Sequence, residues 1–142
     1  MDSSIIFQAA LALLVICVLT GKSPMGLLQS LFQGPPTKED LDKAKDVLDA
    51  ALSSSHVVVV SKASCPYCIR VKSLLTSVKV EFQVVELSSR SDGYAIQTYL
   101  TNLTGQRTVP YVYIGGKLIG GCDDTVSLHS QGKLLSLLNV KA

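Results

Sequence analysis

The chain has 142 residues, of which 47% are hydrophobic and 17% are charged, and its net charge at pH 7 is +2. This length suits one domain with an appended segment. The small net charge and the lack of a basic stripe argue against nucleic-acid binding. No glycine-rich phosphate-binding motif of the G-x-G-x-x-G or G-x-x-x-x-G-K type occurs, so no nucleotide cofactor is implied.

Residues 1–21 form a hydrophobic leader. The run from Ile5 to Leu19 is almost entirely apolar, and only Gln8 and Cys17 interrupt the hydrocarbon. At about 1.5 Å of rise per residue, this run is short for a bilayer core and close to the apolar region of a signal peptide. A buried globular helix fits poorly, because the segment has no amphipathic stripe. We expect a cleaved signal peptide or a retained signal anchor that brings the protein to a membrane of the secretory pathway (endoplasmic reticulum or Golgi).

The side of the membrane on which the domain lies is open at this level. Asn102-Leu103-Thr104 is an N-x-T glycosylation sequon, and Asn102 lies off the apolar face of its predicted helix, so exposure in a lumen would permit a glycan. No Lys or Arg precedes the apolar run and Lys22 follows it, which favours a cytosol-facing domain under the positive-inside rule. We slightly prefer the lumenal face.

Residues 22–36 are predicted to be a linker, because Gly and Pro recur through them, and residues 37–142 to be the folded domain. Thr37 and Asp40 have the spacing of a helix-capping box. A helical repeat of apolar residues follows at Leu41, Ala44, Leu48 and Ala51. The valine run in 56–61 then predicts a buried strand, and 66–77 a helix with Cys68, Val71, Leu75 and Val78 on one side.

The rest of the domain continues this alternation. Val80, Phe82 and Val84 alternate with polar residues and predict a second strand. Asp92 is expected to cap a third helix whose apolar side is formed by Ile96, Tyr99, Leu100 and Leu103, and Gly105 to end it. Gly115-Gly116 predicts a tight hairpin turn between strands 111–114 and 117–119. Asp123 or Asp124 is expected to cap a final helical region, which is broken near Gly132. The order α-βαβ-α-ββ-α predicts a mixed sheet covered by helices.

Cys65-Pro66-Tyr67-Cys68 lies at the junction of the first strand and the second helix. A C-x-x-C in this setting is typical of a thioredoxin-like redox site. The start of a helix stabilises a thiolate at the first cysteine, and the second cysteine is close enough to bridge to it. Zinc binding is disfavoured because the chain has too few other cysteines and histidines to complete a four-ligand site. Haem attachment is disfavoured because Ile69 stands where that motif requires a histidine. A purely structural disulfide is disfavoured because closing so short a loop gives little entropic stabilisation.

Cys65-Pro66-Tyr67-Cys68, Thr108-Val109-Pro110 and Gly120-Gly121-Cys122-Asp123-Asp124 occur in the order and spacing found in glutaredoxins, and the chain resembles this family from about Thr37 to Leu138. Thioredoxins carry a tryptophan before their cysteines, and this chain has none. The resemblance implies an α/β thioredoxin fold with a four-stranded mixed sheet flanked by helices. It also implies that Cys65 and Cys68 are catalytic and that glutathione is bound by Lys62, Tyr67, Gln97, Arg107, Thr108, Val109, Pro110, Cys122, Asp123 and Asp124.

Particular roles follow from the same resemblance. A cis proline at Pro110 would expose the Val109 backbone to the peptide-like glutathione. Lys62 and Arg107 would hold its glycyl carboxylate. Backbone N–H groups at 122–124 would hold the carboxylate at its γ-glutamyl end, and Asp123 the ammonium group.

We therefore expect a dithiol glutaredoxin, a glutathione-dependent thiol–disulfide oxidoreductase acting on glutathionylated or disulfide-bonded proteins. Glutathione is expected as a cosubstrate, with no metal or other cofactor, and the protein as a monomer. One alternative is a dimer that holds a 2Fe–2S cluster as a carrier or sensor. Pro66 argues against it, because cluster-binding relatives generally have a smaller or more flexible residue there. The other alternative is a lumenal reductant of the thioredoxin or isomerase type that does not depend on glutathione.

Overall fold

A computed structural model of the chain describes residue 15 and residues 34–139. The predictions for the leader (1–21) and for most of the linker (22–36) therefore lie outside the described residues. Within the described part of the chain, no helix is both long and apolar enough to cross a membrane.

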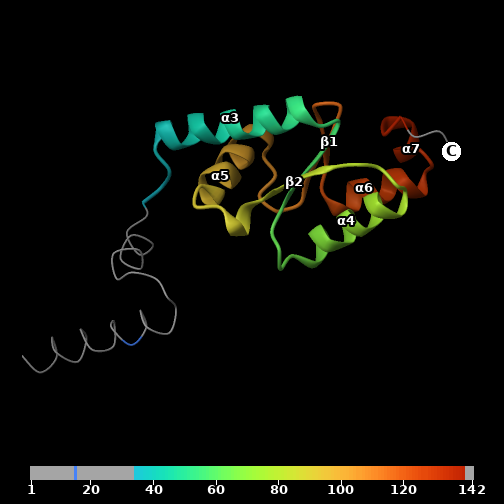
Figure 1. The fold of residues 1–142 in the computed structure, drawn as a ribbon, viewed down its shortest axis with the longest axis horizontal. Coiled ribbons are helices and arrows are strands. Elements are labelled where there is room, and N and C mark those ends of the chain that lie inside the picture. The colour runs from blue at the N-terminus through green and yellow to red at the C-terminus, as the bar shows by residue number, and fades with distance from the viewer. Residues whose placement is uncertain (1–14, 16–33, 140–142) are drawn as a thin grey trace, which may run out of the picture. The chain divides into compact units, whose positions relative to one another are not determined.

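The domain is built on a four-stranded sheet in the order β2-β1-β3-β4, with β1 parallel to β2 and antiparallel to β3, and β4 antiparallel to β3 (Figure 1). This is the mixed sheet, and the element order, that the sequence predicts. The elements are α3 (Lys38–Ser54), β1 (Val57–Ser61), α4 (Pro66–Ser77), β2 (Gln83–Glu86), the short 3₁₀ helix η1 (Leu87–Ser89), α5 (Gly93–Thr104), β3 (Tyr111–Ile114), β4 (Lys117–Gly120), α6 (Cys122–Ser130) and α7 (Leu134–Leu137).

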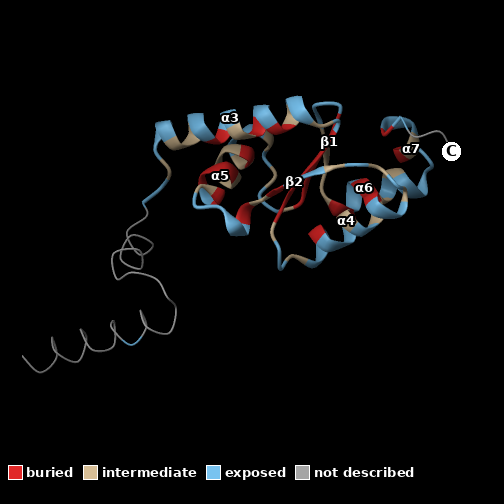
Figure 2. Cartoon of the chain, in the orientation of Figure 1, coloured by how far each residue is buried: buried red, intermediate tan, exposed pale blue. Residues whose placement is uncertain are grey.

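β1 divides the core into two layers, because successive side chains of a strand point to opposite faces. Val58 and Val60 pack with α3 and α5 on one face, and Val57 and Val59 with α4, α6 and α7 on the other. All five residues of β1 are buried, as Figure 2 shows along its length. A strand covered on both faces explains the unbroken valine run in the sequence.

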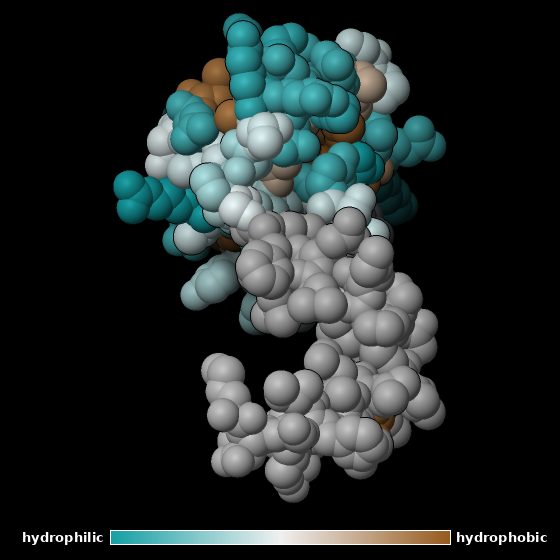
Figure 3. All heavy atoms as spheres, turned by 90° about the vertical axis from the view of Figure 1, so that its left-hand side faces the viewer, coloured by the Kyte–Doolittle hydropathy of each residue, from teal (hydrophilic) through white to brown (hydrophobic). Residues whose placement is uncertain are grey.

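Most of the exposed residues of helix α3 are polar. On the face drawn in Figure 3, hydrophilic residues cover most of the described surface, and hydrophobic ones form only small separate areas. Helix α3 shows the pattern in detail, since its buried residues Ala44, Leu48 and Ala51 recur at helical spacing. The predicted apolar stripe of this helix is therefore confirmed, with Leu41 half-buried at its start.

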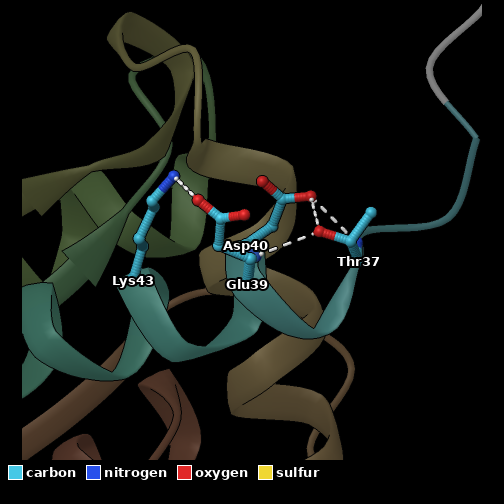
Figure 4. A network of polar contacts seen from close by, with 4 residues as sticks. All are labelled: Thr37, Glu39, Asp40 and Lys43. Atoms are coloured by element: carbon cyan, nitrogen blue, oxygen red, sulfur yellow. Dashed lines mark hydrogen bonds and ion pairs between the residues drawn. The ribbon is translucent and has the colours of Figure 1, made fainter.

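The start of α3 is fixed by the predicted capping box, which Figure 4 shows. Thr37 N–H donates to Asp40 Oδ2 at 2.9 Å, and Asp40 N–H donates to Thr37 Oγ1 at 3.3 Å. One turn on, Lys43 Nζ pairs with Glu39 Oε1 at 2.7 Å. Two N–H groups that have no intrahelical partner are thus satisfied by side chains three residues apart.

The second strand begins later than predicted, at Gln83 instead of Val80. The reason is the end of α4, where Lys79 adopts a left-handed φ of 57°. Lys79 N–H donates to Thr76 O at 3.0 Å and Val80 N–H to Leu75 O at 3.3 Å, which is a Schellman cap. Val80 therefore still belongs to the helix end. Val84, which belongs to the predicted apolar alternation, is 37% exposed because β2 is an edge strand.

Helix α5 differs from prediction at two positions. Asp92 occupies the N-cap position but makes no capping bond, because Arg90 binds its carboxylate through Nε and Nη2, both at 2.8 Å. Leu103 was expected on the buried side, yet it is 59% exposed, since it lies in the last turn, outside both core clusters. Gly105 ends the helix at a left-handed φ of 76°, as predicted.

The hairpin and the last helices follow the predicted arrangement, with one correction. Gly115 and Gly116 both have positive φ, 57° and 75°, as a two-residue hairpin turn between β3 and β4 requires. The final helical region is broken at Gly132 into α6 and α7. The N-cap of α6 is Gly121, so Asp123 and Asp124 lie in the first helical turn and do not occupy the cap position.

Two tyrosines of β3, Tyr111 and Tyr113, point into the same buried layer and differ in one respect. Tyr111 Oη donates to Gln106 O at 2.5 Å, whereas no described residue is within hydrogen-bonding reach of Tyr113 Oη. Burial raises the pKa of Tyr113 to about 12, so this hydroxyl stays neutral. A buried hydroxyl without a partner destabilises a fold.

Tyr111→Phe and Tyr113→Phe should therefore change stability in opposite directions. We expect Tyr111→Phe to lower the free energy of unfolding by about 1 kcal/mol and Tyr113→Phe to raise it by up to about 1 kcal/mol, because only the first removes a hydrogen bond. Urea unfolding of the two variants beside the unmodified protein measures both. A larger loss for Tyr113→Phe than for Tyr111→Phe would show that the Tyr113 hydroxyl has a partner.

Candidate functional site

A groove of about 630 Å³ lies where three segments meet: the start of α4, the loop between α5 and β3, and the start of α6. The register of the sheet brings the first two together, because Val60 near the end of β1 pairs with Tyr111 at the start of β3. The groove is lined by Lys62, Cys65, Tyr67, Gln97, Gln106, Arg107, Thr108, Val109, Pro110, Gly121, Cys122, Asp123 and Asp124.

The groove collects all the residues singled out from the sequence except Cys68, which is fully buried behind it in α4. Two further residues, Gln106 and Gly121, line it and were not singled out. Gly121 is part of the quoted Gly-Gly-Cys-Asp-Asp motif and could have been included on that basis. Gln106 lies between Gly105, which ends α5, and the Thr-Val-Pro motif. Its neighbours belong to recognisable motifs, but no motif indicates a role for Gln106 itself.

Cys65 is the N-cap of α4, with Pro66 at the first helical position, where a backbone N–H is not needed. Its side chain is half-buried and its Sγ lies 3.9 Å from Val109 O. Burial opposes ionisation, but the backbone N–H of Cys68, the Cys68 thiol, the backbone N–H of Tyr67 and the charge of Lys62 together leave the pKa of Cys65 below its ordinary value. Cys65 is therefore the better nucleophile of the pair.

Cys68 has the opposite character. It is completely buried, and burial raises its pKa above the ordinary value of a thiol. Cys65 and Cys68 are one helical turn apart and influence each other's ionisation, so the ionised form is concentrated on Cys65, the less buried of the two. This difference in pKa assigns the attacking role to Cys65, while Cys68 stays protonated and can react in a second step.

The loop opposite Cys65 contains the cis peptide bond Val109–Pro110, as the sequence predicts. No described residue accepts a hydrogen bond from Val109 N–H, and the Val109 carbonyl faces Cys65 Sγ. The preceding residues are fastened to α5, since Gln97 Nε2 donates to Arg107 O at 3.2 Å. Val109 thus offers a backbone donor and acceptor next to the reactive sulfur.

At the start of α6, two neighbouring acids have different surroundings. Asp124 Oδ2 accepts the N–H of Gly121 at 2.9 Å, so this carboxylate is engaged by the fold. Asp123 is exposed and takes part in none of the ion pairs of the described residues. Cys122 is buried and burial raises its pKa, so it contributes a neutral thiol. The first N–H groups of the helix have no intrahelical partner and can bind an anion.

Lys62 and Arg107 likewise take part in none of the ion pairs found in the described ranges. The groove therefore combines two available cations, an available carboxylate, a helix start and a free backbone edge around one activated thiol. This set suits an extended ligand with an anionic group at each end and an ammonium group at one of them. No group of three or more metal-binding side chains is present in residue 15 and residues 34–139.

Comparison with known proteins agrees with this geometry. Residues 57–119 match the family model for glutaredoxin. The chain is 59% identical over 87 residues to a glutaredoxin of Ricinus communis, covering 61% of this chain and 85% of the relative. It is 53% identical over 98 residues to glutaredoxin-C2 of Arabidopsis thaliana, covering 69% and 85% respectively.

Among solved structures, the crystal structure of a buckwheat glutaredoxin–glutathione complex superposes with a TM-score of 0.71 at 47% identity, covering 73% of this chain and 94% of that one. The predicted thioredoxin fold is thereby confirmed. On the sequence match, the shared fold and the activated Cys65 within the groove, the chain belongs to the glutaredoxin family of glutathione-dependent thiol–disulfide oxidoreductases.

Proposed function

We propose that this chain is a dithiol glutaredoxin that reduces both glutathione mixed disulfides and protein disulfides, with glutathione as the electron donor. The observation that carries the proposal is the division between the two thiols. Cys65 is half-buried with a lowered pKa, and Cys68, one turn on, is buried with a raised pKa. This pair provides one thiol that attacks and a second that resolves.

On a glutathionylated protein, only Cys65 is needed. Its thiolate attacks the glutathionyl sulfur, the protein thiolate leaves and takes up a proton, and Cys65 carries the glutathione. A second glutathione thiolate then attacks that glutathionyl sulfur. Oxidised glutathione leaves and the Cys65 thiolate returns.

On a protein disulfide, the Cys65 thiolate attacks one sulfur of the substrate, the S–S bond breaks, and the first substrate thiolate leaves and takes up a proton. Cys68 then attacks the Cys65 sulfur of the mixed disulfide, and its proton goes to the second substrate thiolate as that group leaves. Cys65 and Cys68 remain as a disulfide. Two glutathione molecules reduce that disulfide and become oxidised glutathione. The burial of Cys68 keeps it protonated until the mixed disulfide has formed, because its pKa lies above the ordinary value.

We place glutathione along the groove with its sulfur at Cys65. The Val109 backbone pairs with the cysteinyl unit, Lys62 and Arg107 hold the glycyl carboxylate, and the start of α6 with Asp123 holds the γ-glutamyl end. The proposal is supported by the available charges at both ends of the groove and by the buckwheat relative, which was crystallised as a glutathione complex. Asp124 acts indirectly, since its carboxylate is bonded to Gly121 N–H.

Replacing either cysteine separates the two reactions. Cys65→Ser should abolish reduction of a glutathionylated substrate, because only Cys65 has a lowered thiol pKa. Cys68→Ser should keep much of that activity and lose direct reduction of protein disulfides. Both activities can be followed through oxidised glutathione, with glutathione reductase as the reporter. A Cys68→Ser variant as inactive as Cys65→Ser on the glutathionylated substrate would refute the one-cysteine route.

The charged contacts can be tested at the two ends of the groove. Arg107→Ala and Asp123→Ala should each raise the KM for glutathione by roughly one to two decades, the equivalent of a charge-assisted contact of about 1.5–3 kcal/mol. Lys38→Ala and Asp42→Ala are matched controls, because both residues are exposed on α3 and lie outside the groove. An unchanged KM in both groove variants would remove Arg107 and Asp123 from the site.

We further propose that residues 1–21 direct the domain to a membrane of the secretory pathway, with the lumenal face slightly preferred. Two observations support this: the apolar run of the leader, and the exposure of Asn102, the acceptor of the sequon, on α5. A sequon that faces solvent can carry a glycan without disturbing the core.

Translation with microsomes tests the targeting, scored by protease protection and by glycosidase-sensitive mass. A protected domain, with or without a glycan, is expected and places it in the lumen. An accessible, unglycosylated domain that pellets with the membranes would indicate a cytosol-facing anchor. A domain that remains in the supernatant would refute targeting by the leader.

A further inference from the structure

We propose that Gln106 is a positioning residue for the glutathione reaction, which sets the geometry of the groove without contacting the reacting sulfurs. The inference rests on the proposed function, since it concerns how the same groove receives glutathione. Gln106 belongs to the loop between α5 and β3, and its side chain turns back toward the residues that follow it.

The side chain of Gln106 holds the loop at two points. Its Nε2 donates to Thr108 O at 2.7 Å and to Pro110 O at 2.8 Å. These carbonyls belong to the residues on either side of Val109. One amide nitrogen has two N–H groups, so both donors are used and both neighbouring carbonyls are held by the protein. Of the three carbonyls of residues 108–110, the Val109 carbonyl is the one that the Gln106 amide does not bind, and it faces Cys65 Sγ.

The main chain of Gln106 is itself anchored on both sides. Its N–H donates to Thr104 Oγ1 at 3.1 Å, in the last turn of α5, and its carbonyl accepts from Tyr111 Oη at 2.5 Å. Tyr111 is fully buried in the layer between the sheet and α3 and α5. The backbone of Gln106 is therefore fixed to the core. From this fixed position its side-chain amide can hold residues 108–110 in place relative to the sheet.

Gln106 also lies close to the other side of the groove. Gly121 leaves room there: a Cβ built on it would lie 3.7 Å from Gln106 Nε2 and 3.7 Å from Pro110 O, so a larger residue would reach van der Waals contact with the amide. The amide thus lies between the Val109–Pro110 loop and the residue that caps α6. These two segments are the ones proposed to hold the cysteinyl and γ-glutamyl units of glutathione. We infer that Gln106 sets the distance between them.

The chemistry of the site explains why an amide of this length is needed. A carboxylate has no hydrogen to donate and would repel both carbonyls, and an asparagine is one methylene too short to reach them from the same backbone position. An alanine leaves the carbonyls of the exposed Thr108 and the buried Pro110 without this donor. Each change should loosen the groove while leaving Cys65 on α4, where backbone N–H groups and Lys62 set its reactivity.

The test compares Gln106→Ala and Gln106→Glu with the unmodified full-length protein. Losing two hydrogen bonds should raise the KM for glutathione about tenfold, with kcat at saturating glutathione changed less than about threefold. The rate of Cys65 alkylation by iodoacetamide, a small reagent that does not need the contacts proposed for glutathione, should stay within about twofold. Gln131→Glu is the matched control, because Gln131 is exposed at the end of α6 and the charge change is the same.

Two further readouts distinguish positioning from a general loss of stability. Between about pH 8 and about pH 6, the KM defect of Gln106→Glu relative to the unmodified protein should shrink, because a protonated carboxyl regains one donor, whereas the defect of Gln106→Ala should not. Hydrogen–deuterium exchange of either variant should rise in 106–111 and stay unchanged in α3. This measurement needs no turnover and still decides the question if one variant folds poorly.

The outcomes separate this inference from the proposed function. Turnover by the unmodified protein together with an unchanged KM, or an unchanged exchange of 106–111, in both Gln106 variants would overturn the positioning role. A uniform rise in exchange throughout the domain would also overturn it, because Gln106 would then support folding in general. Lack of glutathione-dependent turnover in the unmodified protein would refute the proposed function, while the exchange data would still test the clamp on the loop.

Discussion

The hydrogen bonding of the Cys65 sulfur at the start of α4 is the interaction on which the rest of the site depends. Backbone N–H groups at the first turn of a helix have no intrahelical partner, so they favour a thiolate placed at the N-cap. Pro66 occupies the first helical position, where a backbone N–H is not needed, and its restricted φ fixes the entry into the helix. Burial opposes ionisation, and at Cys68 it is the largest effect and raises the thiol pKa. Two chemically identical side chains, one helical turn apart, therefore differ in burial and in pKa, so that one attacks the substrate and the other resolves the mixed disulfide.

The sheet delivers the other two sides of the groove to this thiol. β1 runs toward Cys65 and pairs antiparallel with β3, with Val60 opposite Tyr111. The residues just before β3 must then lie beside the residues just after β1, which places Val109 and Pro110 at the sulfur. β4 runs antiparallel to β3 and ends at Gly120, which pairs with Val112. Helix α6 therefore begins at the same end of the strands as Cys65. Three loops that are far apart in sequence are thus brought together by register alone.

Features that a known local sequence motif encodes could be predicted from the sequence, and features that no such motif indicates could not. The capping box at Thr37, the glycine hairpin and the limits of α4 depend on local chemistry and were predicted correctly. The late start of β2 was missed because Lys79, a residue with a side chain, takes the left-handed conformation that usually indicates glycine. Asp92 failed as a side-chain cap because Arg90 competes for its carboxylate, and Gln106 escaped notice because its acceptors are backbone carbonyls, which no side-chain pattern reveals.

The segment Gly120–Asp124 shows that structural and functional roles can be divided between neighbouring residues. Gly120 has a φ of 130°, and a Cβ there would lie closer to Asp124 Oδ2 than van der Waals contact allows. The Asp124 carboxylate approaches the turn to accept the N–H of Gly121. Asp124 is therefore committed to starting α6, and that commitment orients the helix so that its unpaired N–H groups open into the groove. Asp123, one residue earlier, points to solvent and keeps its charge available to a ligand. Identical side chains thus take different roles because helical geometry turns them about 100° apart.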